Sequence, residues 1–418
     1  MSSLAIASWL ATATVALLAQ SFRSRAFAIF RGLLLTIYTL ISLAVLPLLQ
    51  GGISDWRLPQ SIPQQCLYGV LLYLHAAVYL DPLLLIRPRL RRWGYRVLVS
   101  YPALYFTAAM LMSWPWAVAS ALGWPLWVPA LPFVLCLGGV VQSLTTRTSE
   151  PTISVGCVPT TSALQRLPLG QLNASPDNPA VATKASALRL VQITDPHLGP
   201  FMSVARLSGI CERAVAQDPD LIVLTGDYLT MESQADPSAL TTALSPLKGL
   251  PGRVLACLGN HDHEALAIVK GALEANQIQL LVDDSTQRDT RAGRVQILGF
   301  DFHFRNRKER TAAVLQEHPR QDDTLRLVLL HDPGAFRHVP DGEADLVLSG
   351  HTHGGQVGLY SLGLAWTFVQ AVSNIPDHSL WGMGTNRLYV HRGTGHYGYP
   401  LRLGVPAEEG VLSVVHHR

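Results

Sequence analysis

The sequence predicts an N-terminal all-α transmembrane bundle followed by an α/β domain, in which a sandwich of two β-sheets is flanked by helices. Two observations support this division. The first third of the chain contains several apolar stretches close to the ~20 residues that a helix needs to cross a bilayer. The second half alternates short runs rich in Val, Ile and Leu with amphipathic segments, a pattern typical of buried strands with helices between them.

Composition agrees with a membrane-embedded part. The chain has 418 residues, of which 49% are hydrophobic and only 15% are charged, so it is more apolar than an average soluble protein. The net charge of +3 is too small to indicate a nucleic-acid partner. The five cysteines show no CxxC spacing, so we interpret them as small buried residues rather than as a disulfide or zinc framework.

Residues 1–144 are predicted to form a transmembrane region of four or five helices. The candidate spans run from Leu4 to Ala19, Gly32 to Leu49, Cys66 to Ile86, Val97 to Leu122 and Trp124 to Leu144. The last two meet at a tight Gly123-Trp-Pro125 hairpin that could also be a re-entrant pair, which leaves the count open. His75 and Asp81 are ionisable groups inside the third span and are candidates for a functional role. We favour a structural role for both, with Asp81-Pro82 marking a helix end.

Arginines orient the predicted bundle. They crowd the first loop, around Arg23 and Arg31, and the third loop, between Arg87 and Arg96, whereas the second loop has only Arg57 beside Asp55. Positively charged loops remain in the cytoplasm, so loops one and three are expected there. Five spans then place the C-terminal domain in the cytoplasm, which is the arrangement we favour, and four spans place it outside.

A linker is predicted over residues 145–187, which are rich in Ser, Thr, Pro, Asn and Ala and contain a Ser175-to-Pro179 breaker cluster and one short strand, Thr152 to Val158. The α/β domain follows over residues 188–418. Its expected helices are Val204 to Gln217 and His263 to Gln277. Its expected strands are Leu188 to Thr194, Leu221 to Thr225, Val254 to Leu258, Val295 to Phe300, Leu325 to Leu330, Leu346 to Ser349, Leu388 to His391 and Val411 to Val415.

Short polar motifs follow many of these strands. They are Asp195-Pro-His197, Gly226-Asp227, Gly259-Asn-His-Asp262, His331-Asp332 and Gly350-His-Thr-His353. Ligands of α/β proteins gather at the carboxyl ends of strands, so these side chains are expected at one edge of the fold. Asp, Asn and His in such numbers suit two metal ions held close together, which stabilise both the attacking and the leaving oxygen in phosphoester hydrolysis.

Each motif alone also has an ordinary interpretation. The first two could be simple turns, and Asp262 is expected to cap a helix that begins at His263. His331 could be a hydrogen-bonded histidine at the edge of the core. His351 and His353 would point to opposite faces of a regular strand, so they can share a site only where the chain turns, as the neighbouring glycines permit.

Together the motifs resemble one family, the calcineurin-like metallophosphoesterases. The family pattern of D-x-H, GD, GNH[DE], a lone His and GHxH is matched over about residues 188–356. The GHTHGGQ stretch, Gly393-Thr-Gly395 and Pro400-Leu-Arg402-Leu are similar to the membrane-associated YkuE/YaeI-like branch. Two departures are Pro196, where the branch usually has Leu, and His391, where it often has Ser. His391 and His396 could line the substrate entrance or simply pack.

The resemblance implies a role for each motif residue. The first metal would be held by Asp195, His197 and His353 and the second by Asn260, His331 and His351, with Asp227 bridging them. His261 would not bind metal and would instead stabilise the transition state or protonate the leaving oxygen. Mixed imidazole and carboxylate ligation suits Mn, Fe or Zn better than Mg. We therefore expect two divalent metal ions per chain.

The expected function is a membrane-anchored metallophosphoesterase. The resembling branch includes enzymes that cleave UDP-2,3-diacylglucosamine, which favours a lipid or lipid-linked phosphoester or pyrophosphate. A soluble phosphodiester, a non-catalytic metal-binding scaffold and a transporter or sensor remain alternatives. Substrate-binding residues, native metals and oligomeric state are not specified by the sequence. Five aromatic residues could line an apolar groove or belong to the core: Phe302, Phe304, Trp366, Phe368 and Trp381.

Overall fold

The computed structural model describes residues 3–49, 62–86, 88–124, 128–156, 159–169 and 187–417. The chain divides into two compact units, one comprising Met1–Val141 with Gly398–Leu401 and the other Gln142–Tyr397 with Arg402–Arg418. The second predicted loop with Arg57, Arg87 of the third loop, the end of the Thr152-to-Val158 strand and the Ser175-to-Pro179 cluster lie outside the described residues.

The N-terminal unit is helical, with α1 (Ser3–Phe22), α2 (Arg25–Leu49), α3 (Ile62–Leu80), η1 (Asp81–Ile86), α4 (Trp93–Tyr95), η2 (Arg96–Ser100), α5 (Tyr101–Met112) and α6 (Trp114–Ala121). By length and composition three described helices could cross a membrane, or four if the pair from Trp93 to Ala121, bent by 49°, counts as one span. Pro115 starts a new helix there, which accounts for the bend. The fifth expected span contains a shorter apolar helix, α7 (Leu131–Leu144).

His75 makes hydrogen bonds between helices of the N-terminal unit. Its Nε2 lies 2.8 Å from Ser8 Oγ of α1, and its Nδ1 lies 2.8 Å from the Tyr38 hydroxyl of α2. Thr39 continues this buried network to Tyr79 at 2.7 Å. Hydrogen bonds of this kind hold helices together where there is little hydrophobic driving force between them. Asp81 begins η1 at the end of α3, as expected.

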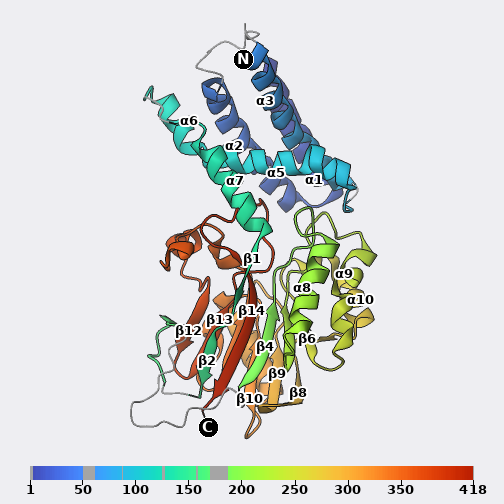
Figure 1. Ribbon diagram of the computed structural model, residues 1–418, viewed down its shortest axis with the longest axis vertical. Helices are drawn as coiled ribbons and strands as arrows, with labels where there is room; N and C mark the ends of the chain where they lie inside the picture. Colours follow the sequence, from blue (N-terminus) through green and yellow to red (C-terminus); the bar gives the residue numbers. More distant parts are fainter. Residues whose placement is uncertain are drawn as a thin grey trace. The chain divides into compact units, whose positions relative to one another are not determined.

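The second unit contains two seven-stranded sheets, and Figure 1 labels many of their strands. The first sheet has the order β1-β14-β4-β5-β6-β7, with β2 also paired to β14, and the second has the order β3-β12-β13-β11-β10-β9-β8. The first comprises β1 (Thr146–Ser149), β2 (Thr152–Val155), β4 (Leu188–Ile193), β5 (Leu221–Thr225), β6 (Val254–Cys257), β7 (Gln279–Leu280) and β14 (Ala407–His416). The second comprises β3 (Gln165–Leu167), β8 (Asp284–Thr290), β9 (Gly293–Gly299), β10 (Leu325–Leu329), β11 (Leu346–Ser349), β12 (Ser379–Met383) and β13 (Asn386–Val390).

Successive side chains of each strand point to opposite faces of its sheet, and both faces contribute to the hydrophobic core. Leu190 and Val223 of the first sheet pack in one buried cluster with Ile297 and Leu327 of the second, so the sheets meet face to face. The intervening residues of the second sheet, such as Val328, form another cluster with α11 (Arg307–Glu317) and η6 (Pro333–His338). Helices α8 (Val204–Ala216), α9 (Pro237–Leu244) and α10 (Leu266–Ala275) lie beside the first sheet in Figure 1.

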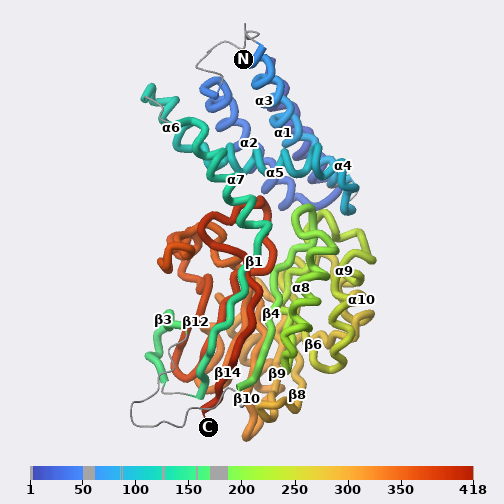
Figure 2. The backbone as a smooth tube through the Cα atoms, in the orientation of Figure 1, coloured from blue at the N-terminus to red at the C-terminus, as the bar shows by residue number. Residues whose placement is uncertain are grey.

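All eight predicted strands are confirmed to within about three residues, apart from an earlier start of β14, and the two predicted helices correspond to α8 and to η5 (Asp262–Ala265) with α10. The segment expected as a linker contains its predicted short strand as β2 of the first sheet, and it also contributes β1 to that sheet and β3 to the second. Figure 2 shows β3 beside β12. The domain limits of 144/145 and 187/188 remain a proposal.

Parallel pairing decides where the motifs gather. Strands β4, β5 and β6 are parallel to one another, and so are β10 and β11. The carboxyl ends within each parallel set therefore lie at one edge, and the polar motifs follow those ends.

Candidate metal centre

Three side chains form the first cluster. Asp195 and His197 come from the loop after β4, and His353 comes from the loop after β11. The Nε2 atoms of the two histidines are 3.1 Å apart, and Asp195 Oδ1 lies 3.4 Å from His353 Nε2. All three residues are buried, and one donor atom of each falls within 4.8 Å of the others. The group could hold a metal ion.

A second cluster consists of Asp227 after β5, His331 after β10 and His351 after β11. The Asp227 carboxylate lies 3.3 Å from His331 Nε2 and 3.6 Å from His197 Nε2 of the first cluster. It is therefore the group that reaches both clusters, which is the position expected of a bridging ligand.

The protonation states suit metal ligation. Burial lowers the pKa of His197 to about 3 and that of His351 to about 4, so both rings are neutral and offer lone pairs. Burial tends to lower the pKa of His331 as well, but the neighbouring Asp227 carboxylate outweighs it, and the pKa of this ring is raised to about 10. A metal ion entering here would displace that proton.

Hydrogen bonds around the clusters determine which side-chain atoms remain available to bind a metal ion. His331 Nδ1 donates to the Thr225 carbonyl at 2.6 Å, which leaves Nε2 facing Asp227. Among the buried side-chain atoms of the described residues that have no hydrogen-bond partner are Asn260 Oδ1 and His351 Nδ1, both on expected ligands. Buried polar atoms are normally satisfied, so these orphans fit a cation that would bind them. The residues present therefore fit two metal ions, with Asn260 as a further oxygen donor.

Backbone conformation also marks this site. Five of the seven expected ligands have a positive φ: Asp195 (51°), His197 (46°), Asp227 (58°), His351 (69°) and His353 (52°). Such backbones cost of order 1–3 kcal/mol each and tend to cluster at functional sites. The turn at His351 and His353 lets both rings serve one site, which a regular strand would prevent.

Gly350 is required by close packing. A Cβ at this position would lie 2.1 Å from Asp195 Oδ2 and 2.2 Å from Thr194 Oγ1, a pair already hydrogen bonded at 2.7 Å. Gly350→Ala should therefore displace the Asp195 carboxylate and weaken binding of the first metal by about 10–100-fold, the scale of disturbing ligand support. Equilibrium dialysis with Mn²⁺ measures this loss.

Gly271→Ala is the matched control, because that glycine lies in α10 and has nothing within 4 Å of its added methyl group. It should bind metal like the parent chain. Equal metal binding by the two variants would contradict the packing argument.

Asp262 does not cap a helix, and that prediction was wrong. Its carboxylate instead accepts backbone N–H groups of Gly259 at 2.7 Å, Asp227 at 2.8 Å and Tyr228 at 2.8 Å. Aspartate suits both a helix cap and a link between two loops, because each needs a short side chain that accepts hydrogen bonds from backbone N–H groups. In this chain Asp262 joins the loop after β6 to the loop after β5 and so positions Asp227.

His261 lies beside the clusters without belonging to either. Its Nδ1 is 3.1 Å from Glu264 Oε1, and Gln234 donates to the other Glu264 oxygen at 2.8 Å. Burial lowers the pKa of His261, but Glu264 and Asp227 outweigh it and raise that pKa above its ordinary value. The ring is therefore held in one orientation with a proton available for transfer.

Tyr397 covers this side of the site, and the sequence pattern did not reveal it. Its ring stacks on His261 with centroids 4.6 Å apart and lies 5.1 Å from the His197 ring. The Gln356 side chain holds the Tyr397 backbone by accepting from its N–H at 3.0 Å and donating to its carbonyl at 3.2 Å. Gln356, the final residue of the GHTHGGQ stretch, thus positions the Tyr397 ring against the His261 ring.

Arg402 is a second residue whose role was not predicted. Its fully buried guanidinium donates to the carbonyls of His353 at 3.1 Å and Arg392 at 2.6 Å, which fixes the loop beneath the first cluster. His391 and His396 are buried and do not line an entrance. Burial lowers their pKa values to about 4 and about 3, so both pack as neutral rings.

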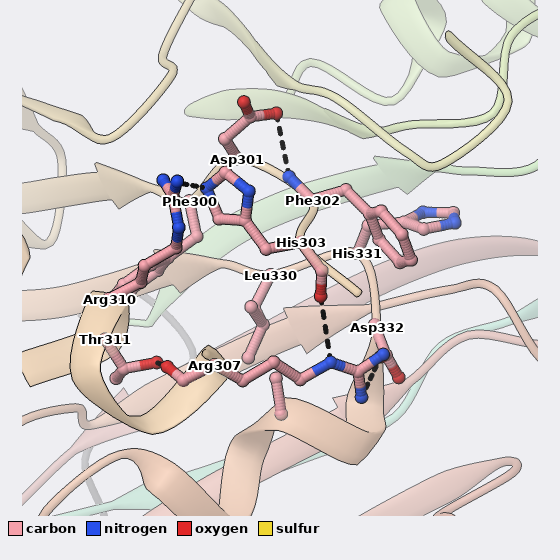
Figure 3. A pocket seen from close by; sticks show the side chains of 11 residues that line it. Phe300, Asp301, Phe302, His303, Arg307, Arg310, Thr311, Leu330, His331 and Asp332 are labelled. Atoms are coloured by element: carbon pink, nitrogen blue, oxygen red, sulfur yellow. Dashed lines mark hydrogen bonds and ion pairs between the residues drawn. The ribbon is translucent and has the colours of Figure 1, made fainter. Parts of the chain in front are cut away.

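A small pocket adjoins the second cluster at His331 (Figure 3). Phe302 forms part of its wall, and its ring lies 5.9 Å from that of His351. Two arginines of α11 reach the pocket: Arg307 pairs with Asp332 at 2.7 Å, and Arg310 donates to His303 at 3.0 Å. The pocket therefore combines an aromatic face with two arginines and two carboxylates, Asp301 and Asp332, next to a candidate ligand.

Comparison with known proteins agrees with this geometry. Residues 188–355 match the family model described as calcineurin-like phosphoesterase. The uncharacterized metallophosphoesterase YkoQ of Bacillus subtilis is 35% identical over 196 residues, which cover 45% of this chain and 70% of that protein. The chain belongs to the calcineurin-like metallophosphoesterase family. By class it is therefore a metal-dependent phosphoesterase.

Two further relatives carry more specific names. Phosphodiesterase YaeI of Escherichia coli is 29% identical over 236 residues, covering 55% of this metallophosphoesterase and 83% of YaeI. UDP-2,3-diacylglucosamine pyrophosphatase LpxG of Chlamydia muridarum is 25% identical over 260 residues, covering 50% of this chain and 78% of LpxG. The family uses divalent metals, and the two clusters are groups of described residues that could hold them.

Proposed function

We propose that this chain is a membrane-anchored phosphohydrolase with two metal ions, which cleaves phosphoester or pyrophosphate bonds of a lipid or lipid-linked substrate. The observation that carries the proposal is the meeting of two three-residue donor clusters at Asp227, with His261 beside them. The first ion would be held by Asp195, His197 and His353, and the second by Asn260, His331 and His351. Mn, Fe or Zn suits this mixture of imidazole and carboxylate donors.

Two such ions would supply Lewis-acid stabilisation of the attacking and leaving oxygens. The chain's own residues do the rest. Asp227 sets the separation of the two ligand groups, and Asp262 holds Asp227 in place through its backbone N–H. His261 gives its proton to the leaving oxygen, and Glu264 keeps the ring oriented for that transfer. Tyr397 shields one face of His261 and limits access of water from that direction.

A lipid-linked substrate is supported by two features. The N-terminal helices long enough to cross a membrane would hold the site near lipids. LpxG, whose name specifies a lipid-linked pyrophosphate, is a relative. A soluble phosphodiester is the second candidate, favoured by the similarity to YaeI.

A substrate panel tests the proposal. The purified full chain in detergent or nanodiscs is loaded with Mn²⁺ and assayed against phosphomonoesters, phosphodiesters and nucleotide-linked lipids. Release of a nucleotide from the lipid-linked pyrophosphate, faster than any soluble diester is cleaved, is the expected result. Turnover of bis-p-nitrophenyl phosphate with no cleavage of any lipid would favour the soluble candidate. No turnover at all with metal bound would favour a non-catalytic scaffold.

We also propose that the catalytic unit faces the cytoplasm: arginines crowd the first and third predicted loops, and a chain with five spans that keeps these loops inside ends in the cytoplasm. Fusions after Arg418 test this. Green fluorescent protein should fluoresce there and alkaline phosphatase should be inactive. Active phosphatase would place the unit outside and remove cytoplasmic nucleotide-linked lipids from the substrate list.

A further inference from the structure

The segment after the GHTHGGQ stretch contains many exposed apolar side chains and no charged ones. From Val357 to Pro376 the sequence contains no Asp, Glu, Lys or Arg. Six large apolar side chains of this segment are between 37% and 74% exposed: Leu359, Leu362, Leu364, Trp366, Phe368 and Val372. We call residues 359–372 the apolar loop. Soluble surfaces rarely present such a patch, which marks an interaction site.

The apolar loop is firmly held at its base. Leu359 N–H donates to the Trp366 carbonyl at 2.9 Å, and Phe368 N–H donates to the Val357 carbonyl at 2.8 Å. Thr367 is buried between them, and its hydroxyl bonds to the buried carboxylate of Asp377. The exposed side chains therefore belong to a segment whose backbone is held by hydrogen bonds at its two ends.

The base lies against the metal-binding turn. A Cβ on Gly355 would come within 2.9 Å of Thr367 Oγ1, so the GHTHGGQ turn packs directly on the loop. His353 of the first cluster is two residues before Gly355. A molecule held by the apolar loop is consequently close to the candidate metal centre.

The apolar loop also adjoins the end of an apolar helix. Gln142, in the last turn of α7, donates to Ser361 Oγ at 3.4 Å and accepts from Gly404 N–H at 2.7 Å, while Ser361 N–H donates to the Gly404 carbonyl at 2.8 Å. Helix α7 itself exposes an apolar stripe at Val134, Leu137, Val141 and Leu144. The apolar loop therefore contacts Gln142, the residue at which the second unit begins.

We propose that the apolar loop inserts into the surface of the lipid bilayer in which the N-terminal helices are embedded. The absence of charge, the exposed Trp366 and the attachment to an apolar helix all fit a bilayer, because tryptophan prefers the membrane–water interface. Segments of this kind enter the boundary between headgroups and acyl chains by about 5–10 Å. The consequence, which rests on the proposed function, is that lipid substrate reaches the metal centre directly from the bilayer.

Site-specific fluorescence tests the insertion without any substrate. A single cysteine is introduced as Leu362→Cys or Val372→Cys into the full chain carrying Cys66→Ser and Cys157→Ser, labelled with an environment-sensitive dye and reconstituted into liposomes. Asp289→Cys is the control, because that side chain is 90% exposed on β8. Metal content and thermal unfolding show that each labelled chain is folded.

Nitroxide lipids should quench the dye at 362 and 372, with more quenching from a nitroxide near the headgroup than from one near the chain end, and should leave the dye at 289 unaffected. Quenching at 362 and 372 no greater than at 289 would overturn the proposal. Cross-linking of two unlabelled Leu362→Cys chains to each other, without quenching of the labelled ones, would also overturn it, since a second copy would then cover the loop. Because no hydrolysis is measured, failure here is distinct from failure of the proposed function.

Discussion

Asp227→Asn should abolish most of the phosphoesterase activity. The carboxylate lies between His197 and His331, so the substitution removes negative charge from both proposed ligand groups at once. Changes to residues that merely support a ligand cost about 10–100-fold, and loss of a shared ligand should exceed ~10²-fold in kcat/KM. Turnover of bis-p-nitrophenyl phosphate, together with bound metal measured by mass spectrometry, gives the result.

Asp289→Asn serves as the control, because this acid is exposed on β8 and remote from the motif residues in the sequence. It should retain full activity and metal. Unchanged turnover in Asp227→Asn would refute the assignment of this residue as the bridging ligand.

His261→Ala should separate catalysis from metal binding. The ring belongs to neither donor cluster, yet the backbone N–H of His261 donates to Asp227 Oδ1 at 2.9 Å, which places the residue beside the clusters. Loss of a general acid typically costs ~10²-fold or more, so kcat should fall by at least that factor while both metal ions remain bound. Loss of metal in parallel with activity would show that His261 is a ligand.

His263→Ala provides the matched control, since this neighbouring histidine is exposed and pairs with Asp301 at 2.9 Å. It should remain close to the parent chain in rate.

Glu264→Gln tests whether the carboxylate acts through His261. The substitution keeps the size of the side chain but replaces the carboxylate that holds Nδ1 at 3.1 Å. It should slow turnover about 10-fold in the parent chain, the lower end for groups that orient a functional side chain. In the His261→Ala background it should cost nothing further, because two residues that act as a unit are not additive. An equal loss in both backgrounds would mean that Glu264 acts independently of His261.

The parts of the fold that the sequence predicted are those with a strong local pattern. Strand β5 (Leu221–Thr225) is a continuous apolar run and matches its predicted limits. Strand β8 was missed because its sequence, Asp284–Thr290, is polar and depends on pairing with β9. Strand β3 was missed for a similar reason, since three residues acquire strand structure only by pairing with β12. Helix α11 begins in a highly charged stretch whose periodicity is weak.

The candidate site shows the same distinction. Its donor residues stand in short motifs at strand ends, so their residue types could be recognised together in the sequence. The supporting contacts join segments far apart in the chain, such as Arg402 with His353 and Gln356 with Tyr397. No local pattern indicates that such segments meet. Asp262 illustrates the limit: an acid beside a predicted helix start suits a cap equally well, and only tertiary structure shows that it holds the Asp227 loop.

The most direct test of the central claim is a titration of the metal-free, purified full chain with Mn²⁺, with bound metal and hydrolysis of bis-p-nitrophenyl phosphate measured in the same samples. The two donor clusters predict that two ions bind per chain and that activity reaches its maximum only when both are present. Full activity without bound metal, or two bound ions with no hydrolysis of any phosphoester, would contradict the account.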